Sequence, residues 1–137
     1  MADEAIIVEL LGENKSGDPV RYTVADGTGI AKGSLMELTS PRTMKIVSGV
    51  DVPIVGILAQ EKVASDGQTS CAVYTNGIFQ MTCGAAESAA IGDFVSAGAV
   101  VNEINIATAA DFEKGWAFGY ALETIVGNGV GQIKIRI

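Results

Sequence analysis

The sequence contains no histidine and few charged residues, and these absences exclude several classes of function. Without histidine, the chain has neither the Ser-His and Cys-His pairs of nucleophilic enzymes nor a histidine metal site. Charged residues make up 18% of the 137 residues, and the net charge is −7. A nucleic-acid-binding surface needs clustered lysine and arginine to neutralise phosphates, so we expect no nucleic-acid partner. We also expect no enzymatic activity, no metal and no cofactor.

Long apolar runs are missing as well, although the composition is apolar. No run approaches the roughly 18 residues of a membrane helix, so we expect no membrane partner. The first 11 residues carry Asp3, Glu4 and Glu9, unlike the apolar core of a signal peptide. Yet 48% of the residues are hydrophobic and the mean hydropathy is +0.35. This apolar excess must be buried in a core or at an interface, which favours oligomer or assembly contacts.

The chain has only two cysteines, Cys71 and Cys83. Two cysteines do not form a disulfide framework, and without a secretion signal we expect reduced thiols. We therefore interpret both as small buried hydrophobic side chains rather than as a functional pair.

What the sequence does contain is a series of short alternating strands separated by glycine turns. In the last of them, 132–137, three isoleucines alternate with Gln, Lys and Arg, which places the isoleucines on a core face. With 118–123 and a connector at Asn128-Gly129, this strand predicts a β-hairpin that ends on the last residue. A second hairpin is predicted at Asn76-Gly77, because Asn-Gly between two apolar strand patterns is typical of a type I′ turn.

Helical signals are few and short. The best candidate is 108–114, where Thr108 can cap the helix and Gly115 can end it. The segment 84–90 fits one or two helical turns, and Val100-Val101 fits a further strand. The whole pattern, with roughly nine or ten strands, predicts an all-β or mainly β fold. We expect a small β-sandwich or partly closed barrel with glycine-rich turns and at most two short helices.

The sequence also predicts how the domain is organised. Residues 1–12 are expected to form an N-terminal arm or edge strand, and residues 13–137 a single β domain. Two stretches within that domain resemble two others further along the chain. An internal duplication would explain both matches, but glycine-rich β sequences also match by chance, so both explanations stay open. The matched pairs are Val55-Gly56-Ile57-Leu58 with Phe118-Gly119-Tyr120-Ala121, and Lys32-Gly33-Ser34-Leu35 with Ile91-Gly92-Asp93-Phe94.

The order of these parts resembles the small capsid decoration (cement) proteins of tailed viruses. In that family a glycine turn and a strand lead into a Gly-apolar-Phe strand. A Gly-Asp-x-Val segment, an apolar-Gly-x-Ala-apolar-Glu strand and an alternating final strand follow. The resemblance covers residues 50–137, with a weaker match at 16–20, and its motifs are glycine patterns rather than chemistry. The matching positions are Gly67, Ala72, Gly77, Phe79, Gly92, Asp93, Val95, Gly119, Ala121 and Glu123.

The resemblance implies a virion structural protein. Such proteins bind the outside of a capsid shell, often as trimers, and stabilise contacts between major capsid proteins. The implied partners are the major capsid protein and further copies of this chain in a homo-trimer, on the capsid surface after assembly in the host cytoplasm. The N-terminal arm would add a strand to an exposed sheet edge of the capsid protein. The candidate interface residues are Ile6, Ile7, Val8, Leu10 and Trp116.

Two other functions stay open on the sequence alone. One is a small β-barrel module that binds an apolar or glycan ligand near Trp116 and Tyr120. The other is a β-rich component of a viral tail, because the pattern does not distinguish head from tail.

Overall fold

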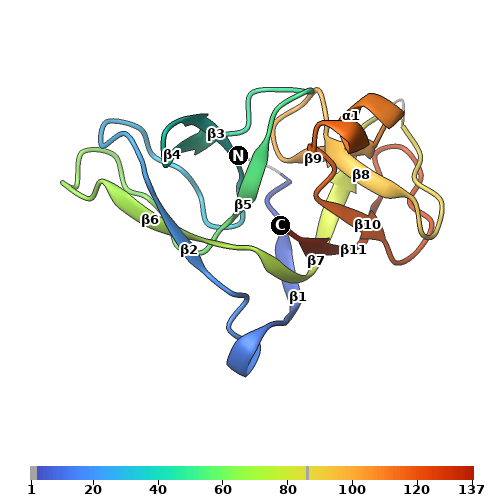
Figure 1. Ribbon diagram of the computed structural model, residues 1–137, viewed down its shortest axis with the longest axis horizontal. Coiled ribbons are helices and arrows are strands. Elements are labelled where there is room, and N and C mark those ends of the chain that lie inside the picture. The colour runs from blue at the N-terminus through green and yellow to red at the C-terminus, as the bar shows by residue number, and fades with distance from the viewer. Residues whose placement is uncertain (1–2, 86) are drawn as a thin grey trace.

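The computed structural model describes residues 3–85 and 87–137 and confirms a mainly β fold (Figure 1). One α-helix and one 3₁₀ helix accompany the strands, in agreement with the expected limit of two short helices. No helix in the described part of the chain is long and apolar enough to cross a membrane. The elements are β1 (Ile6–Leu10), η1 (Glu13–Lys15), β2 (Val20–Thr23), β3 (Leu35–Ser40), β4 (Thr43–Ile46), β5 (Ile54–Leu58), β6 (Ser70–Tyr74), β7 (Asn76–Cys83), β8 (Phe94–Ala97), β9 (Glu103–Ile106), α1 (Ala109–Glu113), β10 (Gly119–Ala121) and β11 (Val130–Arg136).

The strands form two barrels of the same topology. The first closes in the order β2-β4-β3-β5-β6. The second has the order β7-β11-β10-β8-β9 and is closed by a pairing of β9 with β7. In each barrel the strands that come first and third along the chain pair in parallel, namely β2 with β4 and β7 with β9. The other pairings are antiparallel. Figure 1 shows the first barrel on the left and the second on the right, with β1 below and between them.

The two pairs of similar sequence fall on equivalent strands of the two barrels. Gly56 in β5 and Gly119 in β10 each lie against the backbone of the next strand, where an added Cβ would be 2.4 Å from the carbonyl oxygen of Tyr74 or Lys134, respectively. Glycine is therefore needed at the same place in both barrels. A common origin of the barrels by duplication stays a prediction.

The described residues form two hydrophobic clusters, and one of them joins the two barrels as a shared core. The inside of the first barrel is filled by its own cluster, which includes Met36, Leu58 and Val73. A second cluster combines the inside of the second barrel with Leu35 and Ile57 from the outside of the first. Every residue of β5 is buried because it packs against both clusters, which explains why its sequence is a continuous apolar run rather than an alternating one.

The C-terminal hairpin is confirmed, with one correction. β10 and β11 pair antiparallel, and Ile133 and Ile135 are fully buried. The third isoleucine, Ile137, is 48% exposed, so only two of the three face the core. Its strand ends at Arg136, and the Ile137 N–H donates a hydrogen bond of 2.9 Å to the Thr75 carbonyl at the junction between the barrels.

The hairpin predicted at Asn76-Gly77 is wrong. Both residues lie inside β7, which follows β6 almost directly but pairs with β1, β11 and β9. Gly77 is small for a different reason: a Cβ there would lie 3.0 Å from the Glu9 carbonyl oxygen of β1. This Asn-Gly pair therefore belongs to the extended connection from one barrel to the other.

The shorter predictions gave mixed results. Thr108 caps α1 as expected. The described residues of 84–90 contain no helix, and Ala86 lies outside the described part of the chain. Val100-Val101 forms a turn, since the preceding strand ends at Ala97 and the next begins at Glu103.

Cys71 and Cys83 are free and fully buried as predicted, and burial raises the pKa of both thiols.

Candidate interaction surfaces

Three side chains form a row across the outside of the second barrel. Phe94 on β8 is paired with Tyr120 on β10, and Tyr120 is paired with Lys134 on β11. Directly paired residues point to the same side of a sheet, so the three lie next to one another. The rings of Phe94 and Tyr120 meet edge to face with centroids 6.1 Å apart, and the Lys134 Nζ lies 5.9 Å from the Tyr120 centroid.

Helix α1 adds a second phenylalanine to this row. The Phe112 ring packs edge to face on Phe94, with centroids 4.9 Å apart and an angle of 72° between the planes. Phe94 and Phe112 remain 47% and 57% exposed, respectively. We call Phe94, Phe112, Tyr120 and Lys134 the aromatic face. Large aromatic side chains are enriched at protein interfaces, so their exposure here marks a candidate contact surface.

Asp111 holds α1, and thereby Phe112, in place. Its buried carboxylate accepts hydrogen bonds from the Thr108 N–H at 2.8 Å and the Ser96 hydroxyl at 3.2 Å. The Asp111 N–H donates in return to the Thr108 hydroxyl at 3.1 Å, which completes a capping box. Burial alone would raise the pKa of Asp111, but the hydrogen bonds from Thr108 and Ser96 outweigh it and lower the pKa.

Replacing Asp111 with asparagine is expected to lower the free energy of unfolding by about 1 kcal/mol at neutral pH. Because the folded state lowers the pKa, the contribution of the carboxylate is complete above its ordinary pKa and is lost as the pH falls through the lowered value. The two proteins should therefore converge in acid, which urea titrations at neutral and acidic pH would measure. Glu113→Gln, an exposed residue of the same helix, is the control, and a difference that stays constant with pH would contradict the role of Asp111.

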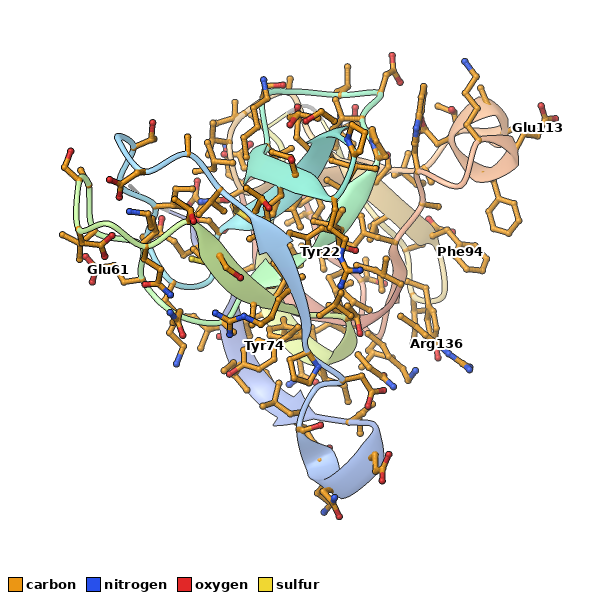
Figure 2. The ribbon with its side chains drawn as sticks, turned by 60° about the vertical axis from the view of Figure 1, so that its left-hand side comes forward. Tyr22, Glu61, Tyr74, Phe94, Glu113 and Arg136 are labelled. Carbon is orange, nitrogen blue, oxygen red and sulfur yellow. The ribbon has the colours of Figure 1, made fainter. Side chains whose placement is uncertain are left out.

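The aromatic face borders a shallow hollow of about 310 Å³. Arg136 also lines it, so two cations stand beside the aromatic rings on a chain whose net charge is −7. Figure 2 shows Phe94 and Arg136 pointing outward on the same side of the molecule, below the helix that carries Glu113. This surface can hold an apolar group and a negatively charged group side by side.

The N-terminal arm forms a second exposed apolar surface. Among the residues that the structure describes, its strand β1 pairs only with β7 and lies at the end of the sheet, so its other edge has no strand partner there. Of the candidate interface residues, Ile6, Ile7 and Val8 are 60%, 37% and 45% exposed. Leu10 is half-buried against the shared core. An open strand edge with exposed apolar residues is a site where another chain can add a strand.

Trp116 is not part of the aromatic face. Its ring is half-buried, with the Lys114 Nζ 4.7 Å from the ring centroid. The hollow is lined by Tyr120 and by Phe118, whereas Trp116 is not part of the lining. The structure thus leaves Trp116 outside the hollow that Tyr120 lines, although the sequence had grouped the two at one ligand site. No group of three or more His, Cys, Asp or Glu side chains among the described residues is placed to hold a metal ion.

Sequence reasoning did not name Phe94 or Lys134 as candidate interface residues. The alternation of the last strand did place Lys134 and Arg136 on the outer side of the hairpin. The pattern around Phe94 gave no such information, because Ile91-Gly92-Asp93-Phe94-Val95 does not show which face of its strand is exposed. Only the pairing of β8 with β10 brings Phe94 next to Tyr120.

No protein-family model and no curated protein matches this sequence. A solved structure is similar: the crystal structure of the head fiber gp8.5 N base in bacteriophage phi29, with a TM-score of 0.54 and 14% sequence identity. The similarity covers 85% of this chain and 93% of that chain. The chain therefore shares its fold with the base of a bacteriophage head fiber.

Proposed function

We propose that this protein is a non-enzymatic structural component of a phage virion and that it associates with the capsid. The observation that carries the proposal is the shared fold with the phi29 head-fiber base, which extends over 93% of that chain. The exposed apolar residues of the arm and of the aromatic face support it, because a protein that works by contact needs such surfaces.

The finer proposal is a decoration or cement role. The protein binds the outside of the shell as a homo-trimer and bridges neighbouring major capsid proteins. The order of glycine motifs described above supports this role. A bridging protein adds buried area between shell subunits, and contact area of this kind stabilises an assembly without any chemistry.

Binding to the shell is the direct test. The purified chain is mixed with empty shells of the phage that encodes it, the shells are recovered on a density gradient, and the chain is quantified by mass spectrometry against the major shell protein. A ratio near one to one is expected for a decoration protein. A few copies per particle would instead identify a vertex or tail component, and no copies would overturn the association with the capsid.

The same shell-binding assay tests the aromatic face and the N-terminal arm as contact surfaces. Phe94→Ala combined with Tyr120→Ala is expected to weaken shell binding by about 30-fold, because buried aromatic anchors dominate interface energies. Ile6→Lys tests the arm without deleting β1, whose Ala5 and Leu10 contact the core. Val63→Ala, at an exposed valine of the first barrel, is the control. Equal binding by all three variants and the wild type would exclude both surfaces from the contact.

A ligand-binding module remains the second candidate because of the 310 Å³ hollow on the aromatic face. Trp116, the only tryptophan, directly precedes Ala117 and Phe118, which line the hollow, so its emission can report on a ligand bound there. Saturable quenching of its fluorescence by a small apolar compound or a glycan would favour this candidate. It would be rejected if none of a panel of such ligands changed the emission.

A further inference from the structure

The aromatic face has a counterpart on the first barrel. There Leu35 is paired with Ile57, and Ile57 is paired with Tyr74. Leu35, Ile57 and Tyr74 thus occupy the positions that Phe94, Tyr120 and Lys134 occupy on the second barrel. The two rows can therefore be compared strand by strand.

The glycines that lead into the two rows confirm this equivalence. Gly33 has φ +91° and Gly92 has φ +87°. The Gly33 N–H donates to the Leu58 carbonyl at 2.9 Å, and the Gly92 N–H donates to the Ala121 carbonyl at 2.8 Å. The backbone therefore makes the same bend, with the same hydrogen bond, in front of both rows.

On the first barrel, the N-terminal arm lies against this bend. The Ala5 N–H donates a hydrogen bond of 2.8 Å to the Gly33 carbonyl, and a Cβ on Gly33 would be 2.5 Å from the Ala5 carbonyl oxygen. Ile6 and Ile7 follow in the chain and line a hollow of about 360 Å³ together with Ile57 and Tyr74. The first barrel thus holds an extended segment of its own chain at the bend in front of its row.

On the second barrel, no segment of the described chain lies against the equivalent bend. A Cβ on Gly92 would meet no atom within 4 Å, and the preceding Ile91 is 69% exposed. Phe94 is 47% exposed, whereas Leu35 at the equivalent position is buried in the cluster that joins the two barrels. The second barrel repeats the backbone of the binding site while its row stays open to solvent.

The two rows differ in charge, and this difference defines what the open one can bind. Tyr74 of the first barrel is replaced by Lys134 in the second, and Arg136 adds a second cation to the lining. A complementary segment needs carboxylates as well as apolar side chains. The arm itself, Asp3-Glu4-Ala5-Ile6-Ile7-Val8-Glu9, is an example of this chemistry.

We propose that the aromatic face binds an extended segment of another protein, made of apolar and acidic residues, which runs beside Gly92 as the arm runs beside Gly33. That this segment belongs to a shell protein rests on the function proposed above. The arm of a second copy is a poorer occupant, because β1 is paired with β7 and Ala5 and Leu10 pack on the core of their own chain. Releasing the arm would expose those contacts.

The probe for the test is a synthetic peptide with the sequence of residues 3–9. The full-length chain is labelled with ¹⁵N and titrated with the peptide while the amide signals are followed by NMR, which detects binding as weak as a dissociation constant of about 1 mM. The signals of Gly92, Phe94 and Tyr120 are expected to shift. Shifts confined to Gly33 and Ile57, or no shift at millimolar peptide, would overturn the proposal.

Charge reversal makes the test specific. Lys134→Glu is expected to weaken peptide binding by at least about fivefold, whereas Lys15→Glu, at an exposed lysine of η1, leaves it unchanged. A peptide with lysine in place of its three acids should prefer the Lys134→Glu variant. Equal effects of the two substitutions would contradict a contact at Lys134.

Two further measurements separate this proposal from its alternatives. Sedimentation without peptide should show no self-association that depends on Lys134, because such association would assign the face to a second copy. Wild-type chain that binds shells but not the peptide would overturn this inference and leave the proposed function standing. Peptide binding by a chain that is absent from shells would overturn the proposed function alone.

Discussion

Replacing Gly56 with alanine is expected to lower the free energy of unfolding by about 3–5 kcal/mol. Gly56 has φ +152°, and a Cβ there would lie 2.4 Å from the Tyr74 carbonyl oxygen and 2.8 Å from a methyl carbon of Val73. The nearest atom belongs to the backbone of β6, so no side-chain rotation relieves the contact. The strand must move, and β5 has no room because all of its residues are buried.

Two other glycines provide the comparison for Gly56→Ala. Gly27 has an ordinary backbone conformation and no atom within 4 Å of an added Cβ, so Gly27→Ala should stay within about 0.5 kcal/mol of the wild type. Gly119→Ala meets the Lys134 carbonyl oxygen at 2.4 Å without the unusual φ, and its loss should be intermediate. Urea unfolding followed by circular dichroism gives all three values. A Gly56→Ala protein as stable as Gly27→Ala would contradict the close approach of β5 to β6.

Alternating sequence predicted the strands that have one buried face. In β6, Cys71 and Val73 are buried while their neighbours are half-exposed, and β11 shows the same period. The period-two rule works here because each strand has a barrel interior on one side and a less buried surface on the other. The mainly β class followed from these strands and from the glycine turns between them.

Sequence reasoning failed where the conformation or burial of a residue is set by contacts with a distant part of the chain. Asn76-Gly77 has the composition of a tight turn, but β1 packs on Gly77 and keeps it extended. Lys62 is fully buried, with its Nζ 2.9 Å from Asp26 Oδ1 and 2.6 Å from Asp66 Oδ1, and its equivalent in the second barrel is Ile125. Nothing in the local sequence indicates that this lysine lies inside the protein.

The two candidate surfaces also differ in whether local sequence or distant contacts determine them. The exposed arm followed from its position and its apolar residues, because both can be read locally. The aromatic face joins β8, α1, β10 and β11, which span some 40 residues of sequence from Phe94 to Lys134. Its assembly depends on strand pairing, and pairing between separate segments was not specified by any motif in the sequence.

Ile57 and Tyr120 offer the sharpest comparison between the two barrels, because they occupy equivalent positions. Ile57 is 1% exposed and belongs to the shared core, so Ile57→Ala is expected to cost about 2–5 kcal/mol. Tyr120 is half-exposed on the aromatic face, so Tyr120→Ala should cost less than about 1 kcal/mol. Urea unfolding followed by Trp116 fluorescence, which reports on the second barrel, measures both.

Because the barrels share a core, Ile57→Ala in the first barrel should shift the unfolding midpoint reported by Trp116 in the second barrel by the full amount. A Trp116 midpoint unchanged by Ile57→Ala would show that the barrels unfold separately, and a loss at Tyr120 equal to that at Ile57 would show that the aromatic face is part of the core rather than a surface open to a partner.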